Sequence, residues 1–175
     1  ALTVEQIETA GGAASHVVAD VTDAADSARL VRTVVERHGG LDSAVDNAGV
    51  FAAGPLHEFD ENTWQRLFDV NVTGVFLSMK HEIAYLREHG GGAIVNVTSN
   101  LGAHKAVPNL GPYGASKAAV TALGRAAAVE YIGEGIRINV VSPGSADTSM
   151  SLQPGEDEAG RAARGRATVP LGRGG

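Results

Sequence analysis

The sequence predicts a single α/β domain, residues 1–175, built on a doubly wound parallel sheet. Two patterns lead to this fold class: short apolar runs alternate in strict order with helical segments, and those runs are apolar at nearly every position. Strict alternation of strand and helix is typical of parallel strands that are joined by right-handed crossovers. Strands without a polar side indicate a sheet that is covered on both faces.

The elements expected along the chain follow from these patterns and from capping residues. Thr22 or Asp23 is suited to begin the first helix, and Gly39 is suited to end it. An apolar stripe with helical spacing, from Trp64 to Leu86, supports a long second helix. Strands are expected at 15–21, 42–46, 93–98 and 136–142, and helices at 23–38, 61–88, 112–132 and, shorter, near 156–166.

The segment after the last expected strand differs in composition from the rest of the chain. It combines several glycines with the acidic run 156–158 and four arginines. Because it directly follows the carboxyl end of a strand, we expect residues 145–170 to form a lid loop over a substrate. A solvated surface loop is the alternative interpretation.

Composition and charge exclude several classes of function. The chain has 14 basic and 20 acidic residues, for a net charge of −6, and no basic stripe, which argues against nucleic-acid binding. The lack of cysteine excludes disulfides and thiolate zinc sites and suits a reducing compartment, so we expect a cytoplasmic protein. The six histidines include no pair four residues apart, so no metal site is predicted. No apolar run approaches a membrane span, and the start ALTVEQIETAGG has no signal-peptide pattern.

Small or polar residues gather where each expected strand ends. Ligands of open parallel sheets bind outside the carboxyl ends of the strands. The expected binding rim therefore consists of Asp20, Asn47, Ala48, Gly49, Thr98, Ser99, Ser142, Pro143 and Gly144.

Tyr113 and Lys117 lie four residues apart on an expected helix, so their side chains share one side of it. A free tyrosine has a pKa of about 10, and a cation within about 4–6 Å lowers the pKa of an acid by about 1–3. The pair is therefore suited to acid-base chemistry near neutral pH, and an ordinary surface pair is the alternative. Ser99, at a strand end, is suited to hold a substrate oxygen beside the tyrosine, or it is a simple capping serine.

Asn71 falls on the apolar stripe of the long helix, three residues after Phe68 and four before Val75. An amide that faces a core costs about 1–3 kcal/mol unless it is hydrogen-bonded. Two interpretations stay open: a structural amide that is bonded to backbone, or a residue of a functional site.

Taken together, these segments resemble the short-chain dehydrogenase/reductase family over nearly the whole chain. The resemblance implies an incomplete Rossmann-like fold and an oxidoreductase that uses NAD or NADP on a small alcohol or carbonyl substrate. The matching pieces, in order and with family-like spacing, are Asp20-Val21, Asp46-Asn47-Ala48-Gly49, Asn71 in NVTG, Ser99 in SNLG, Tyr113 and Lys117 in YGASK, and Pro143-Gly144 followed by Thr148.

The resemblance also implies a role for each matching residue. Tyr113 would be the acid-base, and Lys117 would lower its pKa and hold the nicotinamide ribose. Ser99 would fix the substrate oxygen, and Asn71 would hold a water in the proton relay. A homo-oligomer, either a dimer or a tetramer, would form through the 61–88 and 112–132 helices. The implied cofactor contacts are Asp20 and Val21 at the adenine, Asn47, Ala48 and Gly49 along the adenosine side, and Pro143, Gly144, Ala146 and Thr148 at the nicotinamide amide.

The sequence also departs from the family pattern. No Gly-x-x-x-Gly-x-Gly loop follows a strand upstream of Asp20, and the family continues beyond the last residues of this chain, so we expect an internal part of a longer protein. Asp46 stands where the family usually has Asn. A non-catalytic nucleotide-binding module, or an inactive part of the enzyme, is the alternative to an active oxidoreductase. The intact set of Asn71, Ser99, Tyr113 and Lys117 favours the enzyme.

Overall fold

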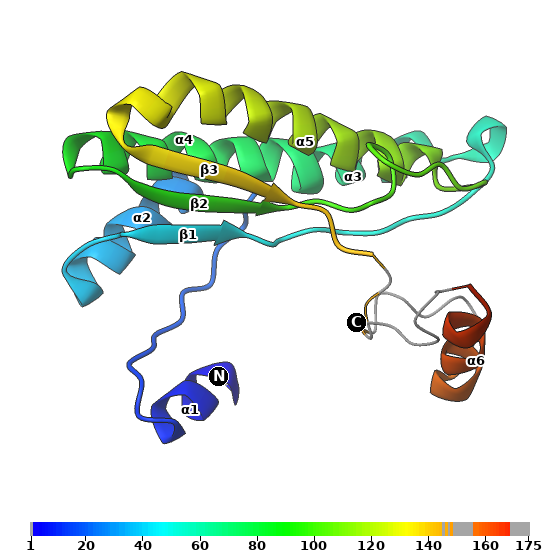
Figure 1. Ribbon diagram of the computed structural model, residues 1–175, viewed down its shortest axis with the longest axis horizontal. Coiled ribbons are helices and arrows are strands. Elements are labelled where there is room, and N and C mark those ends of the chain that lie inside the picture. Colours follow the sequence, from blue (N-terminus) through cyan, green and yellow to red (C-terminus); the bar gives the residue numbers. More distant parts are fainter. Residues whose placement is uncertain (1, 145, 147, 149–155, 169–175) are drawn as a thin grey trace.

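A three-stranded parallel sheet lies at the centre of the molecule, in the order β1-β2-β3 (Figure 1). The computed structural model describes residues 2–144, 146, 148 and 156–168. Its strands are β1 (Ser43–Asp46), β2 (Gly92–Val97) and β3 (Ile136–Val141), each within a residue of the predicted bounds. The parallel α/β class is confirmed, with three strands in the described chain.

The predicted helices are present, and one further helix precedes them. Asp23 begins α2 by accepting hydrogen bonds from two backbone N–H groups, and Gly39 ends it with a φ of 84°. The N-terminal helix α1 was not expected from the apolar pattern. The helices are α1 (Leu2–Thr9), α2 (Ala24–His38), α3 (Glu61–Phe68), α4 (Gly74–Glu88), α5 (Gly111–Tyr131) and α6 (Glu158–Thr168), with short turns η1 (Leu56–Glu58), η2 (Asp69–Thr73) and η3 (Ile132–Glu134).

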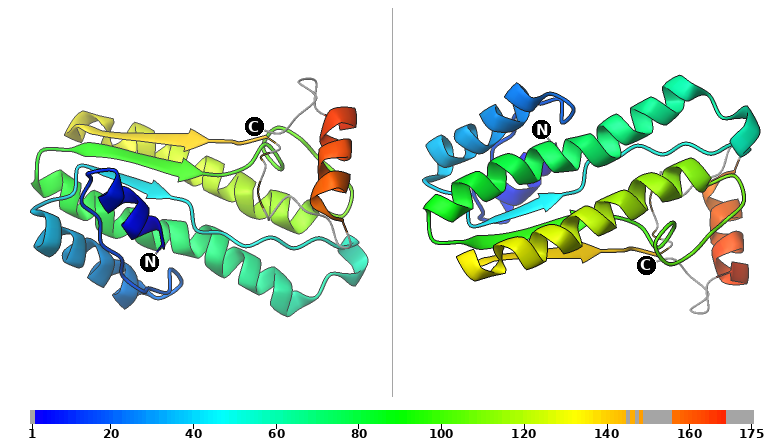
Figure 2. Two further views of the ribbon diagram at one scale, coloured as in Figure 1. Left: turned by 90° about the horizontal axis from the view of Figure 1, so that it is seen from below. Right: turned by 90° about the horizontal axis from the view of Figure 1, so that it is seen from above.

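Helices cover one face of the sheet. Figure 2 shows α4 and α5 over the sheet and α2 beside α4, and α4 and α5 carry the core together with apolar residues of the strands. On the other face Val45 is 64% exposed and Val141 is 47% exposed. The expectation of a sheet covered on both faces is therefore wrong for the described chain. The strands have apolar residues on both sides, but no described helix packs on the second side.

The long helix predicted at 61–88 is continuous and contains one π-helical turn. This turn, η2, separates α3 from α4, and the Gly74 N–H reaches back five residues to the Asp69 carbonyl. A π turn inserts one extra residue into a helix and is frequent at functional sites. Asn71 lies inside it and is fully buried.

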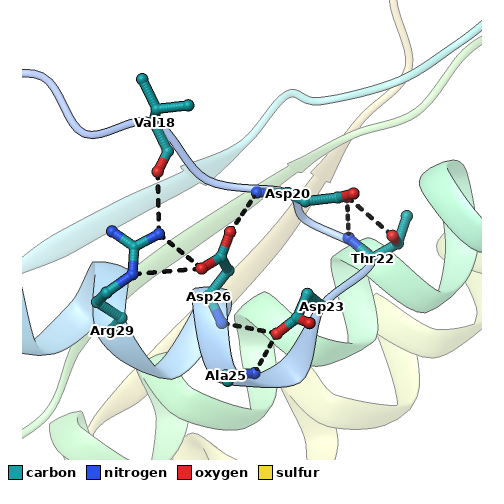
Figure 3. A network of polar contacts seen from close by, with 7 residues as sticks. All are labelled: Val18, Asp20, Thr22, Asp23, Ala25, Asp26 and Arg29. Atoms are coloured by element: carbon teal, nitrogen blue, oxygen red, sulfur yellow. Dashed lines mark hydrogen bonds and ion pairs between the residues drawn. The ribbon is translucent and has the colours of Figure 1, made fainter.

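The strand predicted at 15–21 is absent. No strand of the described chain lies beside this segment, so an extended backbone there has no ladder of hydrogen bonds to join. Side chains of α2 hold its end instead, as Figure 3 shows. The Arg29 guanidinium donates to the Val18 carbonyl, and the Asp26 carboxylate accepts from the Asp20 N–H at 2.8 Å. Arg29 and Asp26 also pair with each other.

Candidate active site

The carboxyl ends of the three strands meet the start of α5 at one edge of the sheet (Figure 1). Gly49 follows β1, Ser99 follows β2 and Pro143 follows β3. The Pro143 carbonyl accepts from the Asn100 N–H at 3.0 Å, which ties two of these ends together. The residues of the predicted binding rim, which come from segments far apart in the sequence, therefore lie together at this edge of the sheet.

Ser99 lies against Tyr113 because two backbones approach very closely beside them. Gly102 has a φ of 97°, and a Cβ at that position would lie 2.0 Å from the Gly114 carbonyl oxygen. Only glycine permits this crossing of the loop over the start of α5. Ser99 and Tyr113 are both buried, and the Ser99 hydroxyl lies near enough to the Tyr113 phenol to act on its pKa.

Lys117 is also buried, with 5% of its surface exposed. Its ammonium donates a hydrogen bond to the Val97 carbonyl at 3.1 Å. A Cβ on Gly49 would lie 3.3 Å from the Lys117 Nζ atom and 3.2 Å from the Asn71 Oδ1 atom. Gly49 therefore leaves room for both side chains under the loop that follows β1.

The amide of Asn71 joins this loop to α5. Its Oδ1 accepts from the Val50 N–H at 2.8 Å, and its Nδ2 donates to the Val50 carbonyl at 3.0 Å. The Nδ2 also donates to the Ser116 hydroxyl, which in turn donates to the Tyr113 carbonyl. Both ends of the amide are thus hydrogen-bonded to protein, and these bonds join the loop after β1 to α5. The role of Asn71 in holding a water of the proton relay stays a prediction.

Two contacts in the site were not argued from the sequence, although Phe51 was expected to line the substrate pocket. Ser116 connects Asn71 to the backbone of Tyr113. Phe51 packs the edge of its ring against Tyr113, with centroids 5.0 Å apart and an interplanar angle of 67°. The sequence indicates these two residues only by their positions, since Phe51 follows Gly49 by two residues and Ser116 directly precedes Lys117.

Burial shifts both titratable groups toward their neutral forms. It raises the pKa of the Tyr113 phenol, and the nearby Ser99 hydroxyl offsets part of that rise. It lowers the pKa of the Lys117 ammonium. The net shift at Tyr113 is therefore opposite to the lowering of its pKa that the Tyr-Lys spacing suggests.

The remaining predicted residues lie around this centre in different ways. Asn47 and Ala48 are exposed on the rim after β1. Asp20 is exposed and accepts from the Thr22 N–H and hydroxyl, which lower its pKa (Figure 3). Val21 packs on α4, because a Cβ on Gly74 would lie 2.9 Å from it.

The segment predicted as a lid is described only in part. Thr148 donates its N–H to the Ala146 carbonyl, and its own carbonyl accepts from Arg161 of α6 at 2.9 Å. Residues 145, 147, 149–155 and 169–170 of the predicted lid lie outside the described residues. The lid therefore stays a prediction.

Comparison with known proteins adds to this geometry. A family model described as short chain dehydrogenase matches residues 1–159. This chain belongs to the short-chain dehydrogenase family. Cis-4-hydroxycyclohexanecarboxylate dehydrogenase of Sinomonas cyclohexanicum is 42% identical over 169 residues, which make up 95% of this chain. The chain spans 66% of the length of that relative.

Two solved structures of the short-chain dehydrogenase family superpose closely on this chain. A short-chain type dehydrogenase/reductase from Mycobacterium marinum has a TM-score of 0.90 and 34% identity, covering 99% of this chain and 68% of that one. A gluconate 5-dehydrogenase from Burkholderia cenocepacia J2315, in complex with NADP and tartrate, has a TM-score of 0.89 and 29% identity at the same coverage. The Rossmann-like fold is thereby confirmed.

The described residues carry neither a cluster of metal ligands nor a membrane-spanning helix. No group of three or more His, Asp or Glu side chains among them is placed to hold a metal ion. None of the described helices is long and apolar enough to span a bilayer.

We predict that Asn71→Ala lowers the free energy of unfolding by about 1–3 kcal/mol, because the buried Val50 N–H and Ser116 hydroxyl lose a partner. Denaturant titration of the protein that carries this chain measures the loss. Asn62→Ala, which truncates an exposed amide on α3, is the matched control and should be nearly neutral. Equal stability of the Asn71 variant and the control would contradict the role given to this amide.

Proposed function

We propose that the protein carrying this chain is an oxidoreductase that transfers a hydride between NAD or NADP and a small alcohol or carbonyl substrate. The observation that carries the proposal is the burial of Ser99, Tyr113 and Lys117 together at the carboxyl edge of the sheet. Lysine is rarely buried without a task. No carboxylate among the described residues contributes to the pKa of Lys117, so its charge is left for a ligand or for the tyrosine.

The residues present fit the nicotinamide side of such a cofactor. The Lys117 ammonium has three N–H donors and spends one on the Val97 carbonyl, which leaves donors for ribose hydroxyls. Gly49 has no side chain to block this approach. When bound, the nicotinamide supplies the hydride acceptor or donor. The proposed cofactor contacts are Lys117, Tyr113, Asn47, Ala48, Gly49, Pro143, Gly144, Ala146 and Thr148, with Asp20 and Val21 at the adenine.

The proton chemistry falls to the side chains of the chain itself. We assign the Ser99 hydroxyl to the substrate oxygen and the Tyr113 Oη atom to the proton. In alcohol oxidation the ionised Tyr113 takes the hydroxyl proton, and in carbonyl reduction the neutral phenol gives it back. Lys117 favours the ionised phenol by its charge, which is needed because burial raises the Tyr113 pKa. Asn71 fixes the loop that carries Phe51.

The proposed substrate is a small alicyclic secondary alcohol or the matching ketone. Phe51 is 43% exposed and contacts Tyr113 with its ring, so its open surface gives the site an apolar wall beside the proton-transferring oxygen. An apolar wall next to two polar groups suits a hydrocarbon ring that carries one hydroxyl. The name of the relative from Sinomonas cyclohexanicum, a hydroxycyclohexanecarboxylate dehydrogenase, agrees with this class.

We further propose that two or more copies associate through α4 and α5. Phe76 on α4 and Val129 on α5 are 47% and 80% exposed, so these two helices offer apolar side chains that a second copy could cover. Light scattering of the whole protein at micromolar concentration decides between an oligomer and a monomer. The cytoplasmic location stays a prediction.

Tyr113→Phe should abolish turnover and leave NAD(P)H binding nearly intact, because the phenyl ring keeps the packing and lacks the proton. Steady-state rates and a fluorescence titration of NAD(P)H measure the two effects. Tyr85→Phe, on α4 and away from Ser99, is the control. A Tyr113 variant within threefold of wild-type rates would contradict the assignment. If the wild-type protein binds NAD(P)H without any turnover, the non-catalytic nucleotide-binding module is the correct alternative.

Lys117→Met should move the pH at which alcohol oxidation begins upward by about 1 or more, because the ionised Tyr113 loses its stabilising charge. The sign follows from the acid: removing a cation raises the pKa of the phenol, so the base form appears only at higher pH. Profiles of kcat against pH give the shift. Lys80→Met removes an exposed ammonium from α4 as the control. If the profile of kcat against pH does not move while NAD(P)H binds more weakly, Lys117 binds the ribose and does not shift the pKa of Tyr113.

A further inference from the structure

Two buried carboxyl groups lie between the sheet and α4. Asp46 is the last residue of β1 and Glu82 belongs to α4, and each is 8% exposed. The Asp46 Oδ2 and Glu82 Oε2 atoms have no hydrogen-bond partner among the described residues. An ionised carboxylate in such a place is costly unless it is paired. The mechanism proposed above uses neither group.

The fold itself brings the two carboxyls together. Ala44 packs against the core that α4 builds, and Asp46, two residues later on the same strand, shares that face. Met79 and Glu82 lie three residues apart on α4, and the Met79 sulfur accepts from the amide of Asn96, the β2 residue opposite Asp46. Glu82 thus lies one helical turn beyond a residue that contacts the strand neighbour of Asp46.

Among the described residues, the groups around the pair offer no counter-charge. From β2, Asn96 is opposite Asp46 in register, and its amide donates to the Met79 sulfur while its Oδ1 has no described partner. His81 of α4 lines the groove against α2 instead, together with Arg32 and Glu36. Burial raises the pKa of Asp46 to about 7, and burial together with the Asp46 charge raises that of Glu82 to about 8.

We propose that Asp46 and Glu82 share a proton at neutral pH and act as positioning residues that fix the end of β1 on α4. One carboxyl is protonated and donates to the free oxygen of the other, so the two partnerless oxygen atoms are satisfied together. The loop Asn47–Gly49 begins directly after Asp46, so the pair holds the base of the proposed cofactor rim. At alkaline pH both groups ionise and repel each other within the core.

The sign of the pH dependence follows from the raised pKa values. Between about pH 4 and pH 8 the folded protein holds more protons on this pair than the unfolded chain does. Stability therefore falls as the pH rises through this range, and the unfolding equilibrium constant rises about tenfold per pH unit for each extra proton held.

Infrared spectroscopy and denaturant titration between pH 5 and 9, on the whole protein, test the shared proton. Wild type should show a carboxylic-acid carbonyl band at pH 7. The double variant D46N/E82Q should lack this band. The control variant E88Q, which changes a residue at the exposed end of α4, should keep it. The double variant should also lose most of the fall in stability toward pH 9. No such band in wild type, or equal pH slopes in wild type and double variant, would overturn the proposal.

Asp46→Asn keeps the shape of the side chain and covers the case in which the double variant does not fold. Its stability relative to wild type should rise as the pH rises, and a difference that does not change with pH overturns the proposal. The positioning role rests on the proposed function: NAD(P)H affinity should fall between pH 7 and 9 in wild type and much less in D46N. If wild type does not bind NAD(P)H, the proposed function is wrong. The infrared and stability results still show whether Asp46 and Glu82 share a proton.

Discussion

The arrangement of the site depends on the buried amide of Asn71, because this single group joins segments that the chain keeps far apart. It closes on the backbone of Val50 with both of its ends and reaches Ser116 with the second N–H of its amide nitrogen. Val50 leads directly to Phe51, and Ser116 directly precedes Lys117. The π turn places Asn71 in this position, since an extra residue in a helix shifts the direction of the side chains that follow it.

A boundary between core and site crosses the sheet from strand to strand. Ala44, Ile94 and Ile138 form one cross-strand row that faces the helices and belongs to the apolar core. The next row on that face is Asp46, Asn96 and Val140, and two of its three side chains are polar. The change occurs at the carboxyl ends of the strands, where ligands of parallel sheets bind. The buried polar side chains of the site therefore lie directly next to the last row of the apolar core.

Much of this organisation could be predicted from the sequence, and the exceptions share a cause. Local signals such as the Asp23 cap, the Gly39 stop and the spacing of Tyr113 and Lys117 each act within a few residues. The strand expected at 15–21 failed because a strand needs a neighbour, and a single run of apolar residues does not report one. The π turn and the contact of Phe51 with Tyr113 were missed for the same reason, since both depend on how distant segments pack.

Burial acts in one direction on four titratable groups that the fold encloses between the sheet and its helices. It raises the pKa of Tyr113, Asp46 and Glu82 and lowers that of Lys117, so each group moves toward its neutral form. The proposed chemistry, in contrast, needs an ionised phenol beside a charged lysine. Burial therefore opposes the ionisation of Tyr113, and a ligand that favours the ionised phenol offsets this cost when it enters the site. Ligand binding and proton release are consequently linked at Tyr113, and this linkage follows from the depth at which the fold buries the pair.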